Sequence, residues 1–466
     1  MKDGREEESK RKVGGKEAEG QGSNNPKTSS SPDPGSQETQ HSALSTQHSA
    51  LENLGTQHSK TGGLPRSAII IGLVSLMADT SSEMIYPILP LFLTQTLNAP
   101  ATVVGLIEGI AVGTASIVSG VSGWISDRIG RRKPVAFVGY SLTAISRPMI
   151  ALAAAWPVVL GARFADRFGK GIRGAPRDAL LAESAPEDQR GRAFGFERAM
   201  DSTGAVVGPI IGLLLLGWAG INIRTIFFIS AVPAVIAALL ILAVRERRED
   251  VVAGSKNIKL SLAGTTREYR RLLLIIGIFG LANSANAFLI LRAAQLGRGD
   301  LSSAQMGSEI PSIAIMAYAF YNLVSALFSM PAGVASDRLG RRDLLVVGYI
   351  IYAASYVGFA AANAAWMVWP LFAIYGLFPA LSDGVAKAMV VDTAGKAGRG
   401  TVIGIYSAVV GITQIAASLI GGLLWDSLGS WATFGFGAAL AAIAALLLLA
   451  LFPSRMETGR EATSAA

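Results

Sequence analysis

The sequence predicts an all-α membrane protein with twelve transmembrane helices, arranged as two pseudo-symmetric bundles of six. Three observations support this fold class. Of the 466 residues, 51% are hydrophobic and only 16% are charged, with a mean hydropathy of +0.43, whereas soluble domains are about one quarter charged. Apolar stretches of the roughly 20 residues that a bilayer span needs alternate with short charged turns. One such turn occurs twice, half a chain apart.

Five segments are expected along the chain. Residues 1–65 form a polar, low-complexity tail that cannot bury a core and is predicted to be disordered. Residues 66–244 hold the first six helices, 245–268 a charged cytoplasmic connector, 269–452 the second six helices, and 453–466 a short cytoplasmic tail. The helices are predicted at about 67–96, 101–127, 133–154, 156–182, 191–217, 220–244, 269–297, 307–337, 343–362, 364–393, 400–427 and 430–452.

The composition restricts the chemistry that the membrane body can perform. There is no cysteine, which excludes disulfides and thiolate metal sites. All three histidines lie in the tail, at spacings that suit a metal chelator poorly, so no metal site is expected. Proton coupling in the body would therefore depend on carboxylates. Without histidine and cysteine there is also no nucleophile–base set for catalysis, so an enzyme is not expected.

The basic residues predict the orientation in the membrane. They gather in alternate loops, after the second, fourth, sixth, eighth and tenth helices. Under the positive-inside rule these loops face the cytoplasm, and so do both termini. A multi-pass protein of the plasma (inner) membrane is expected. The formal net charge of +8 then reflects topology and not nucleic-acid binding.

The duplicated turn is the most specific motif of the sequence. It reads GWISDRIGRRKP from Gly123 to Pro134 and GVASDRLGRRD from Gly333 to Asp343, with the copies 210 residues apart. The two copies share Gly, Ser-Asp-Arg, Gly and Arg-Arg at identical spacing. The gating candidates among these are Gly123, Asp127, Arg128, Gly130 and Arg131 in the first copy, and Gly333, Asp337, Arg338, Gly340 and Arg341 in the second. This pattern resembles the loop between helices two and three of the major facilitator superfamily of secondary transporters. The resemblance to this family extends along the chain from about Ser67 to Phe452.

The resemblance implies a central cavity lined by helices one, four, seven and ten, with alternating access by rocking of the two halves. It also implies that the duplicated turn is a latch that holds the outward-facing state closed on the cytoplasmic side. The alternative is that the basic turns only set topology. ADTSSEMIYP (Ala78 to Pro87) and GKGIRGAPRDA (Gly169 to Ala179) are similar to a prokaryotic subgroup of the superfamily to which no cargo is assigned.

Charged residues inside the predicted membrane helices are the functional candidates, because an isolated charge at the bilayer centre costs at least about 3 kcal/mol. Along the fourth helix, a stripe about 100° wide carries Arg163, Asp166, Arg167, Lys170 and Arg177. The proton-coupling candidates are Asp79, Glu83, Glu108, Asp201 and Glu197. From the helical rise, Asp201 is expected near the level of Arg167, and Glu197 near Lys170. The alternative is a set of purely structural ion pairs.

The second half offers polar and aromatic side chains instead of charge. The cargo-binding candidates there are Asn283, Asn286, Arg292, Tyr318 and Tyr321, alongside Arg163, Asp166, Arg167 and Lys170 of the first half. Amides and aromatic rings suit an organic solute better than a bare ion. The alternative is that the tyrosines only pack or lie at the membrane interface.

The fifth helix carries a glycine–proline pattern, Gly195, Gly204, Gly208, Pro209 and Gly212. It is similar to a motif associated with proton antiporters of the superfamily, except that Leu213 stands where a second glycine is usual. Glycines permit close helix packing, and proline bends the helix, which would shape a seal between the halves. Close packing alone is the competing explanation.

These observations favour a proton-coupled exporter of a small organic molecule, drug-like or a metabolite. The alternative is proton-coupled uptake of an anionic organic solute, and a less favoured one is a non-transporting membrane sensor. No cofactor is expected besides the proton gradient. The expected partners are a small-molecule substrate and the lipid bilayer, without nucleic acid, and the protein is expected to be monomeric.

Overall fold

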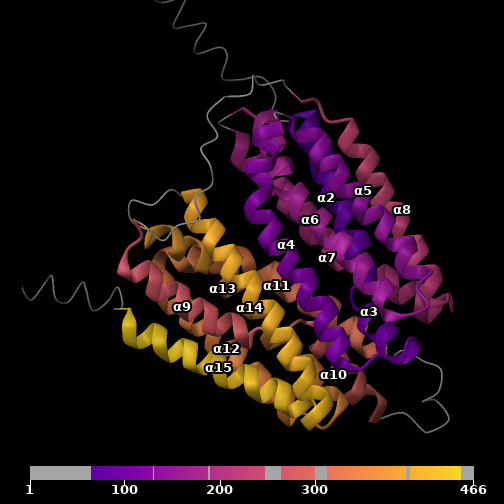
Figure 1. Cartoon of the computed structure of the whole chain (residues 1–466), viewed down its shortest axis with the longest axis vertical. Coiled ribbons are helices and arrows are strands. Elements are labelled where there is room, and N and C mark those ends of the chain that lie inside the picture. The colour runs from indigo at the N-terminus through magenta and orange to yellow at the C-terminus, as the bar shows by residue number, and fades with distance from the viewer. Residues whose placement is uncertain are drawn as a thin grey trace, which may run out of the picture. The chain divides into compact units, whose positions relative to one another are not determined.

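The computed structural model describes residues 64–129, 131–186, 189–246, 264–299, 312–394 and 399–452, and within these residues the ordered elements are all helices (Figure 1). In chain order they are α2 (Arg66–Ile85), α3 (Leu89–Leu91), η1 (Phe92–Thr96), α4 (Ala101–Ile129), α5 (Arg132–Ala151), α6 (Trp156–Ser184), α7 (Arg190–Leu213), η3 (Leu214–Trp218), α8 (Ile223–Leu242), α9 (Arg267–Ala282), α10 (Ala287–Gly299), α11 (Ser312–Leu339), α12 (Arg341–Ala361), η4 (Ala365–Met367), α13 (Val368–Asp392), α14 (Arg399–Leu428) and α15 (Ser430–Leu451).

The predicted fold class is confirmed. α2, α3 and η1 together form the first expected span, α9 and α10 the seventh, and η4 and α13 the tenth. Among the described residues, ten segments are long and apolar enough to cross a membrane, and α5 and α6 are the two more polar ones. The predicted tails at 1–65 and 453–466 lie outside the described residues except for residues 64 and 65, and of the connector at 245–268 the structure describes residues 245–246 and 264–268.

Two of the expected helices are interrupted, each for a local reason. α2 ends at Ile85, just before Tyr86-Pro87. Tyr86 still has helical backbone angles, but Pro87 has no N–H group with which to continue the helical hydrogen bonds. The seventh span, expected to be continuous over 269–297, is broken between α9 and α10, where Asn283 leaves the helical region with ψ 74°. Irregular backbone at membrane depth needs partners. The hydroxyl of Tyr352 donates to the Ala282 carbonyl at 2.8 Å and thereby satisfies one freed group.

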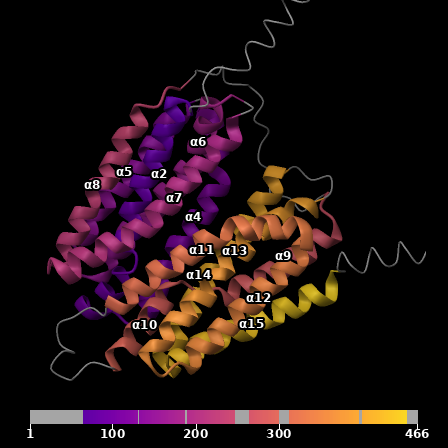
Figure 2. The same ribbon diagram turned by 180° about the vertical axis from the view of Figure 1, so that it is seen from behind.

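The helices of each half pack on one another. In the first half α2 packs on α7 and α8, α4 on α6, and α5 on α6 and α8. In the second half α9 packs on α14 and α15, α12 on α13 and α15, and α11 on α13. Both views show α2, α5 and α8 side by side, and α9, α12 and α15 likewise (Figures 1 and 2). α4 of the first half and α14 of the second form the most extensive contact between the halves.

Glycines make the contact between α4 and α14 tight at one end. A β-carbon on Gly105 would overlap the carbonyl oxygen of Ser418, and one on Gly109 would lie 3.0 Å from the Ser418 β-carbon. One on Gly120, nearer the other end of α4, would meet nothing closer than 3.7 Å. The two backbones are therefore in close contact near the start of α4 and separate toward its end. We call these the Asp426 end and the Arg132 end of the helices, after residues that lie there.

Asp426 of α14 caps the first turn of α4 at the Asp426 end. Its carboxylate accepts hydrogen bonds from the backbone N–H groups of Ala101 (3.0 Å) and Thr102 (2.7 Å) and from the Thr102 hydroxyl (2.5 Å). The first N–H groups of a helix have no partner within the helix, and a carboxylate there also interacts favourably with the helix dipole. The second half thus supplies the cap of a helix in the first half.

Replacing Asp426 with alanine is expected to weaken closure of the Asp426 end. Loss of such a cap costs about 1 kcal/mol, which corresponds to roughly a fivefold shift toward separated ends. The chain contains no cysteine, so spin labels on Asn98→Cys and Ser427→Cys would report the separation without interference. Asp426→Asn keeps one acceptor oxygen and should have a smaller effect. Equal distance distributions for wild type and Asp426→Ala would rule out this role.

Candidate functional site

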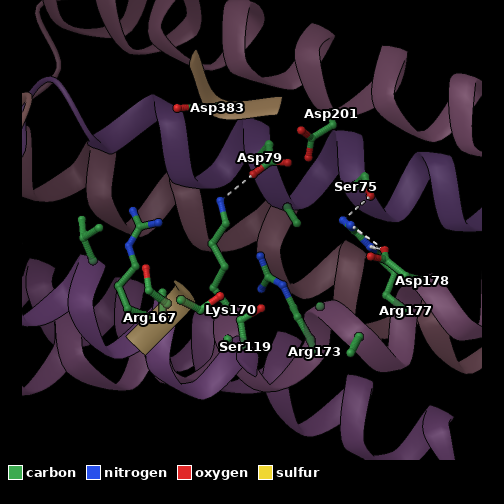
Figure 3. Close-up of a pocket in the computed structure, with 18 of the residues that line it drawn as sticks. Ser75, Asp79, Ser119, Arg167, Lys170, Arg173, Arg177, Asp178, Asp201 and Asp383 are labelled. Carbon is green, nitrogen blue, oxygen red and sulfur yellow. Dashed lines mark hydrogen bonds and ion pairs between the residues drawn. The ribbon is translucent and has the colours of Figure 1, made fainter. Parts of the chain in front are cut away.

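A cavity of about 590 Å³ lies between the two halves, on the Arg132 side of the tight contact between α4 and α14 (Figure 3). Its walls come from α2, α4, α5, α6 and α7 of the first half and from α13 and α14 of the second. Among the described residues that line it, the basic side chains are Arg167, Lys170, Arg173, Arg177, Arg198 and Lys387. The acidic ones are Asp79, Asp178, Asp201 and Asp383. The cavity is therefore strongly polar, with more basic than acidic groups.

The charged stripe of α6 divides into a buried layer and a layer that borders the cavity. Arg163 and Asp166 are almost fully buried and do not line the cavity, whereas Arg167, Lys170 and Arg177 do. Figure 3 shows Arg167, Lys170 and Arg173 extending from α6 toward the helix that carries Asp79. The stripe predicted from helical periodicity thus contributes one wall of the cavity.

The buried layer is a network of four side chains from three helices. Arg163 of α6 holds both carboxylate oxygens of Glu108 of α4, with Nη2 at 2.7 and 2.8 Å. Asp166 lies between Arg163 (3.2 Å) and Arg147 of α5 (3.3 Å). Arg147 also donates to the hydroxyls of Ser81 and Ser82 on α2. Glu108, Arg163 and Asp166 therefore join helices in this structure, which is the structural alternative to the roles predicted for them.

Glu197 and its partners form a second pairing, closer to the Arg132 end. Glu197 was expected near the level of Lys170, and in the structure it pairs with Arg177, with the two charged groups 2.8 Å apart. Ser75 of α2 joins this pair, because its hydroxyl donates to Glu197 at 2.7 Å and accepts from Arg177 at 3.1 Å. The ion-pair partner of Glu197 thus lies seven residues, or about two helical turns of α6, beyond Lys170.

Asp79, Lys170 and Asp201 form a cluster on the cavity wall. The Lys170 ammonium lies 3.4 Å from the Asp79 carboxylate, and much of the lysine side chain is exposed to the cavity. The carboxyl groups of Asp79 and Asp201 are within hydrogen-bonding reach of each other, and Figure 3 shows them facing one another. Asp201 was expected near Arg167, and the structure places it beside Asp79 instead. Two carboxyl groups in such contact must share a proton to form a hydrogen bond.

Glu83 lies outside the cavity and connects the two halves. Its carboxylate accepts a hydrogen bond of 2.9 Å from the hydroxyl of Tyr318 on α11. The Tyr318 ring lies 5.1 Å from that of Tyr86 and 5.6 Å from that of Tyr321. Glu83 and Tyr318 thus belong to a buried contact between α2 and α11, and neither lines the cavity in this conformation.

The other candidates of the second half also have structural partners. Asn286 accepts from the Tyr375 hydroxyl at 2.8 Å, and Asn283 is the residue at which α9 ends. Arg292 donates to the carbonyls of Phe359 and Ala362, at the end of α12. None of Asn283, Asn286, Arg292, Tyr318 and Tyr321 lines the described cavity. In this conformation the described cavity therefore gives no support to the prediction that these side chains hold part of the cargo.

The duplicated turn is only partly described. The side chains of Gly123, Asp127, Arg128, Gly130, Gly333, Asp337 and Arg338 lie outside the described residues. Gly340 has φ +98°, a backbone conformation that favours glycine, so the sharp turn there requires this residue. Arg341 interacts with the Ala388 carbonyl and with Asp392 at the end of α13. The exposed side chain of Arg131 stands at the start of α5. The latch role remains a prediction.

The glycine pattern of α7 packs within the first half. β-Carbons on Gly204, Gly208 and Gly212 would each come within 2.8 Å of α2 backbone atoms, so only glycine permits this approach. Gly195 meets nothing within 4 Å, and Pro209 lies inside α7 shortly before the helix changes to η3. The contact fits the close-packing explanation. In this conformation these glycines do not form a seal between the halves.

Sequence reasoning missed several residues of the site. Arg173 lies about 20° outside the predicted stripe at 100° per residue, and a slightly wider sector would have included it. Its guanidinium donates to Thr143 at 2.8 Å and lies 4.3 Å from the Tyr140 ring centre. Asp426 was detectable as an acid in an otherwise apolar segment. Nothing in the sequence indicated Ser75, because serine is common in membrane helices.

The comparisons with known proteins agree with one another. Residues 71–316 and 300–465 match the model of the family described as Major Facilitator Superfamily. An uncharacterised MFS-type transporter from Methanocaldococcus jannaschii is 33% identical over 401 residues, which cover 86% of this chain and 98% of the relative. The class E tetracycline resistance protein from Escherichia coli is 25% identical, with 83% and 96% covered.

Solved structures show the same fold at low sequence identity. A nucleoside transporter is similar with a TM-score of 0.68 and 14% identity, over 83% of this chain and all of its own. A POT family transporter bound to 5-aminolevulinic acid has a TM-score of 0.69 and 14% identity, with 84% and 97% covered. At this identity the likeness bears on the fold alone.

Proposed function

Because the chain belongs to the major facilitator superfamily, we propose that it exports a small organic molecule by proton-coupled alternating access. It is a multi-pass membrane transporter and not an enzyme. The observation that carries the proposal is the cluster of Asp79, Lys170 and Asp201 on the cavity wall. This cluster supplies a site where a proton and a cargo group compete for the same carboxyl groups.

The exchange follows from the charges of the cluster. With the cavity open at the Arg132 end, a cargo molecule enters and displaces the proton shared by Asp79 and Asp201. The Arg132 end then closes and the Asp426 end opens, which exposes the site to the opposite side of the membrane. There a proton replaces the cargo. Because proton and cargo use the site in turn, each transport step of one is tied to a step of the other. The likeness to tetracycline resistance proteins favours export as the direction.

The orientation and setting complete the proposal. The Arg132 end carries basic turns at Arg132, Lys133, Arg341 and Arg342, so it faces the cytoplasm by the positive-inside rule. Both termini are then cytoplasmic, and the protein is a monomer in the plasma membrane that uses the proton gradient without a cofactor. The cargo enters from the cytoplasm in the conformation described here.

A second candidate is proton-coupled uptake of an anionic organic solute. The excess of basic over acidic side chains around the cavity favours it, because such a cavity attracts negative charge. In this scheme the anion forms an ion pair with Lys170 and breaks the ion pair between Lys170 and Asp79. The Asp79 carboxylate, without its positive partner, then accepts a proton more readily. Anion and proton bind together instead of in turn. The two candidates thus predict opposite effects of cargo on proton binding.

Proton movement in inverted membrane vesicles distinguishes the two candidates. With a pH gradient established, a panel of cationic, neutral and anionic compounds is added and proton release is followed. Under the export proposal at least one compound triggers proton loss with wild type, and Asp201→Asn abolishes it. Glu268→Gln removes an exposed carboxylate outside the cavity and should behave as wild type. If no compound moves protons, but labelled anions enter right-side-out vesicles on acidification, export is replaced by uptake.

A further inference from the structure

Among the described arginines that line the cavity, Arg167 is the buried one whose guanidinium makes no hydrogen bond. Its side chain is buried, with 9% of the residue exposed, yet it lines the cavity. Its Nε atom lies 3.5 Å from Asp166, beyond a hydrogen bond, and has no other partner among the described residues. Each N–H of a guanidinium taken out of water needs an acceptor. Because Nε is buried beside Asp166, the donors that Arg167 offers to the cavity are those of its Nη groups, which make no hydrogen bond within the described residues.

The neighbouring charges explain why no carboxylate is hydrogen-bonded to Arg167. Arg163 has both oxygens of Glu108, and Asp166 is already hydrogen-bonded to Arg147 and Arg163. The buried layer of α5, α6 and α4 thus holds three arginines against two carboxylates. The third arginine, Arg167, is the one that borders the cavity. The layer has one positive charge more than it can pair, and this charge faces the space that the cargo enters.

The remaining acids near Arg167 are engaged elsewhere. Glu83 accepts from Tyr318, and Asp79 is paired with Lys170. Within the described part of the chain, Asp166 is the one carboxylate that lies within 4 Å of the Arg167 guanidinium. A planar guanidinium with free donors matches two oxygens of a carboxylate or phosphate at once.

We propose that Arg167 binds an anionic group of the cargo, a carboxylate or a phosphate. The assignment rests on the proposed alternating-access transport and not on its direction. In the export scheme the same cargo also carries a group that competes with the proton at Asp79 and Asp201, whereas in the uptake scheme the acid group alone is sufficient. The cargo then carries its acid group at the closed end of the cavity, and the rest of the molecule extends along Lys170 toward the Arg132 end. A neutral analogue without the acid group loses this contact and leaves the Arg167 charge unpaired.

Direct binding tests the assignment without transport. Purified protein in detergent is titrated with benzoate and with phenyl phosphate, and with the neutral benzamide as a matched compound, while the melting temperature is followed. We expect the two anions to raise the melting temperature of wild type and benzamide to leave it unchanged. Arg167→Gln should weaken anion binding at least about tenfold, because charge-assisted hydrogen bonds are lost. Arg167→Lys keeps the charge but not the two-point geometry and should be intermediate.

Two controls separate binding from stability. Without ligand, Arg167→Gln should melt at or above the wild-type temperature, because Asp166 keeps two arginines and an unpaired buried charge is removed. Arg66→Gln removes an exposed positive charge at the start of α2 and should bind anions as wild type does. The stronger response among the two anions identifies carboxylate or phosphate as the preferred group.

Three results would overturn the proposal. The first is that wild type and Arg167→Gln bind the anions equally well. The second is that benzamide binds as well as benzoate. The third is that neither anion raises the melting temperature of wild type, even at concentrations that would saturate a weak binding site. Loss of proton coupling in the vesicle experiment would instead contradict the proposed function. The two failures are distinguishable, because binding is measured on purified protein without a gradient.

Discussion

Replacing Gly105 with leucine is expected to give a folded protein that does not transport. In the described conformation a β-carbon at this position overlaps the backbone of Ser418, so α4 and α14 cannot close at the Asp426 end. Overpacking of this kind costs about 1–3 kcal/mol, or roughly a 5- to 150-fold shift between two conformations. A backbone atom on a helix moves less easily than a side chain, so we expect the upper part of this range.

Spin labels on Asn98→Cys and Ser427→Cys measure this shift directly, with cargo-induced proton release as the functional readout. Gly161→Leu is the matched control, because this helical glycine of α6 has nothing within 4 Å of the position of a β-carbon. It should show wild-type distances and transport. If Gly105→Leu gives the same distances as Gly161→Leu, the glycine contact does not close the Asp426 end.

The helices and the charged wall of the cavity were predictable because both depend on local patterns. Long, mostly apolar segments between charged turns define the spans, and the 100° periodicity places Arg167 and Lys170 on one face of α6. These inferences need only the length of a segment and the angle between residues on one helix. The structure confirms the fold and places both residues on the cavity wall.

The partners of each charge were less predictable, because they depend on the tilt and rotation of neighbouring helices. Asp201 lies beside Asp79 and not at Arg167, and Glu197 pairs with Arg177 and not with Lys170. Counting residues from a helix end fixes depth only for parallel helix axes. The break at Asn283 was also not detectable, because no glycine or proline marks it and its stability depends on Tyr352 of another helix.

Removal of one partner of the Glu108–Arg163 pair is expected to destabilise the protein strongly. Both side chains are almost fully buried, and the pair connects α4 to α6 by three hydrogen bonds of 2.7 to 3.0 Å. Glu108→Gln removes the negative charge and leaves Arg163 to share Asp166 with Arg147. Leaving one charge of a buried pair without its partner costs about 3–5 kcal/mol. The free energy of unfolding in detergent, measured by denaturant titration, should fall by this amount.

A double replacement distinguishes the cost of an unpaired charge from the value of the pair itself. Glu108→Leu with Arg163→Met removes both charges and keeps apolar volume between the helices. Such replacements of buried pairs are often neutral or stabilising, so the double variant should recover most of the lost stability. Glu268→Gln, at an exposed position, should change the free energy of unfolding by less than about 0.5 kcal/mol. If the double variant is as unstable as Glu108→Gln, the charged pair itself stabilises the contact between α4 and α6. If the double variant regains the free energy of unfolding of wild type, the charged pair is not needed for stability, and its presence is then better explained by a role in function.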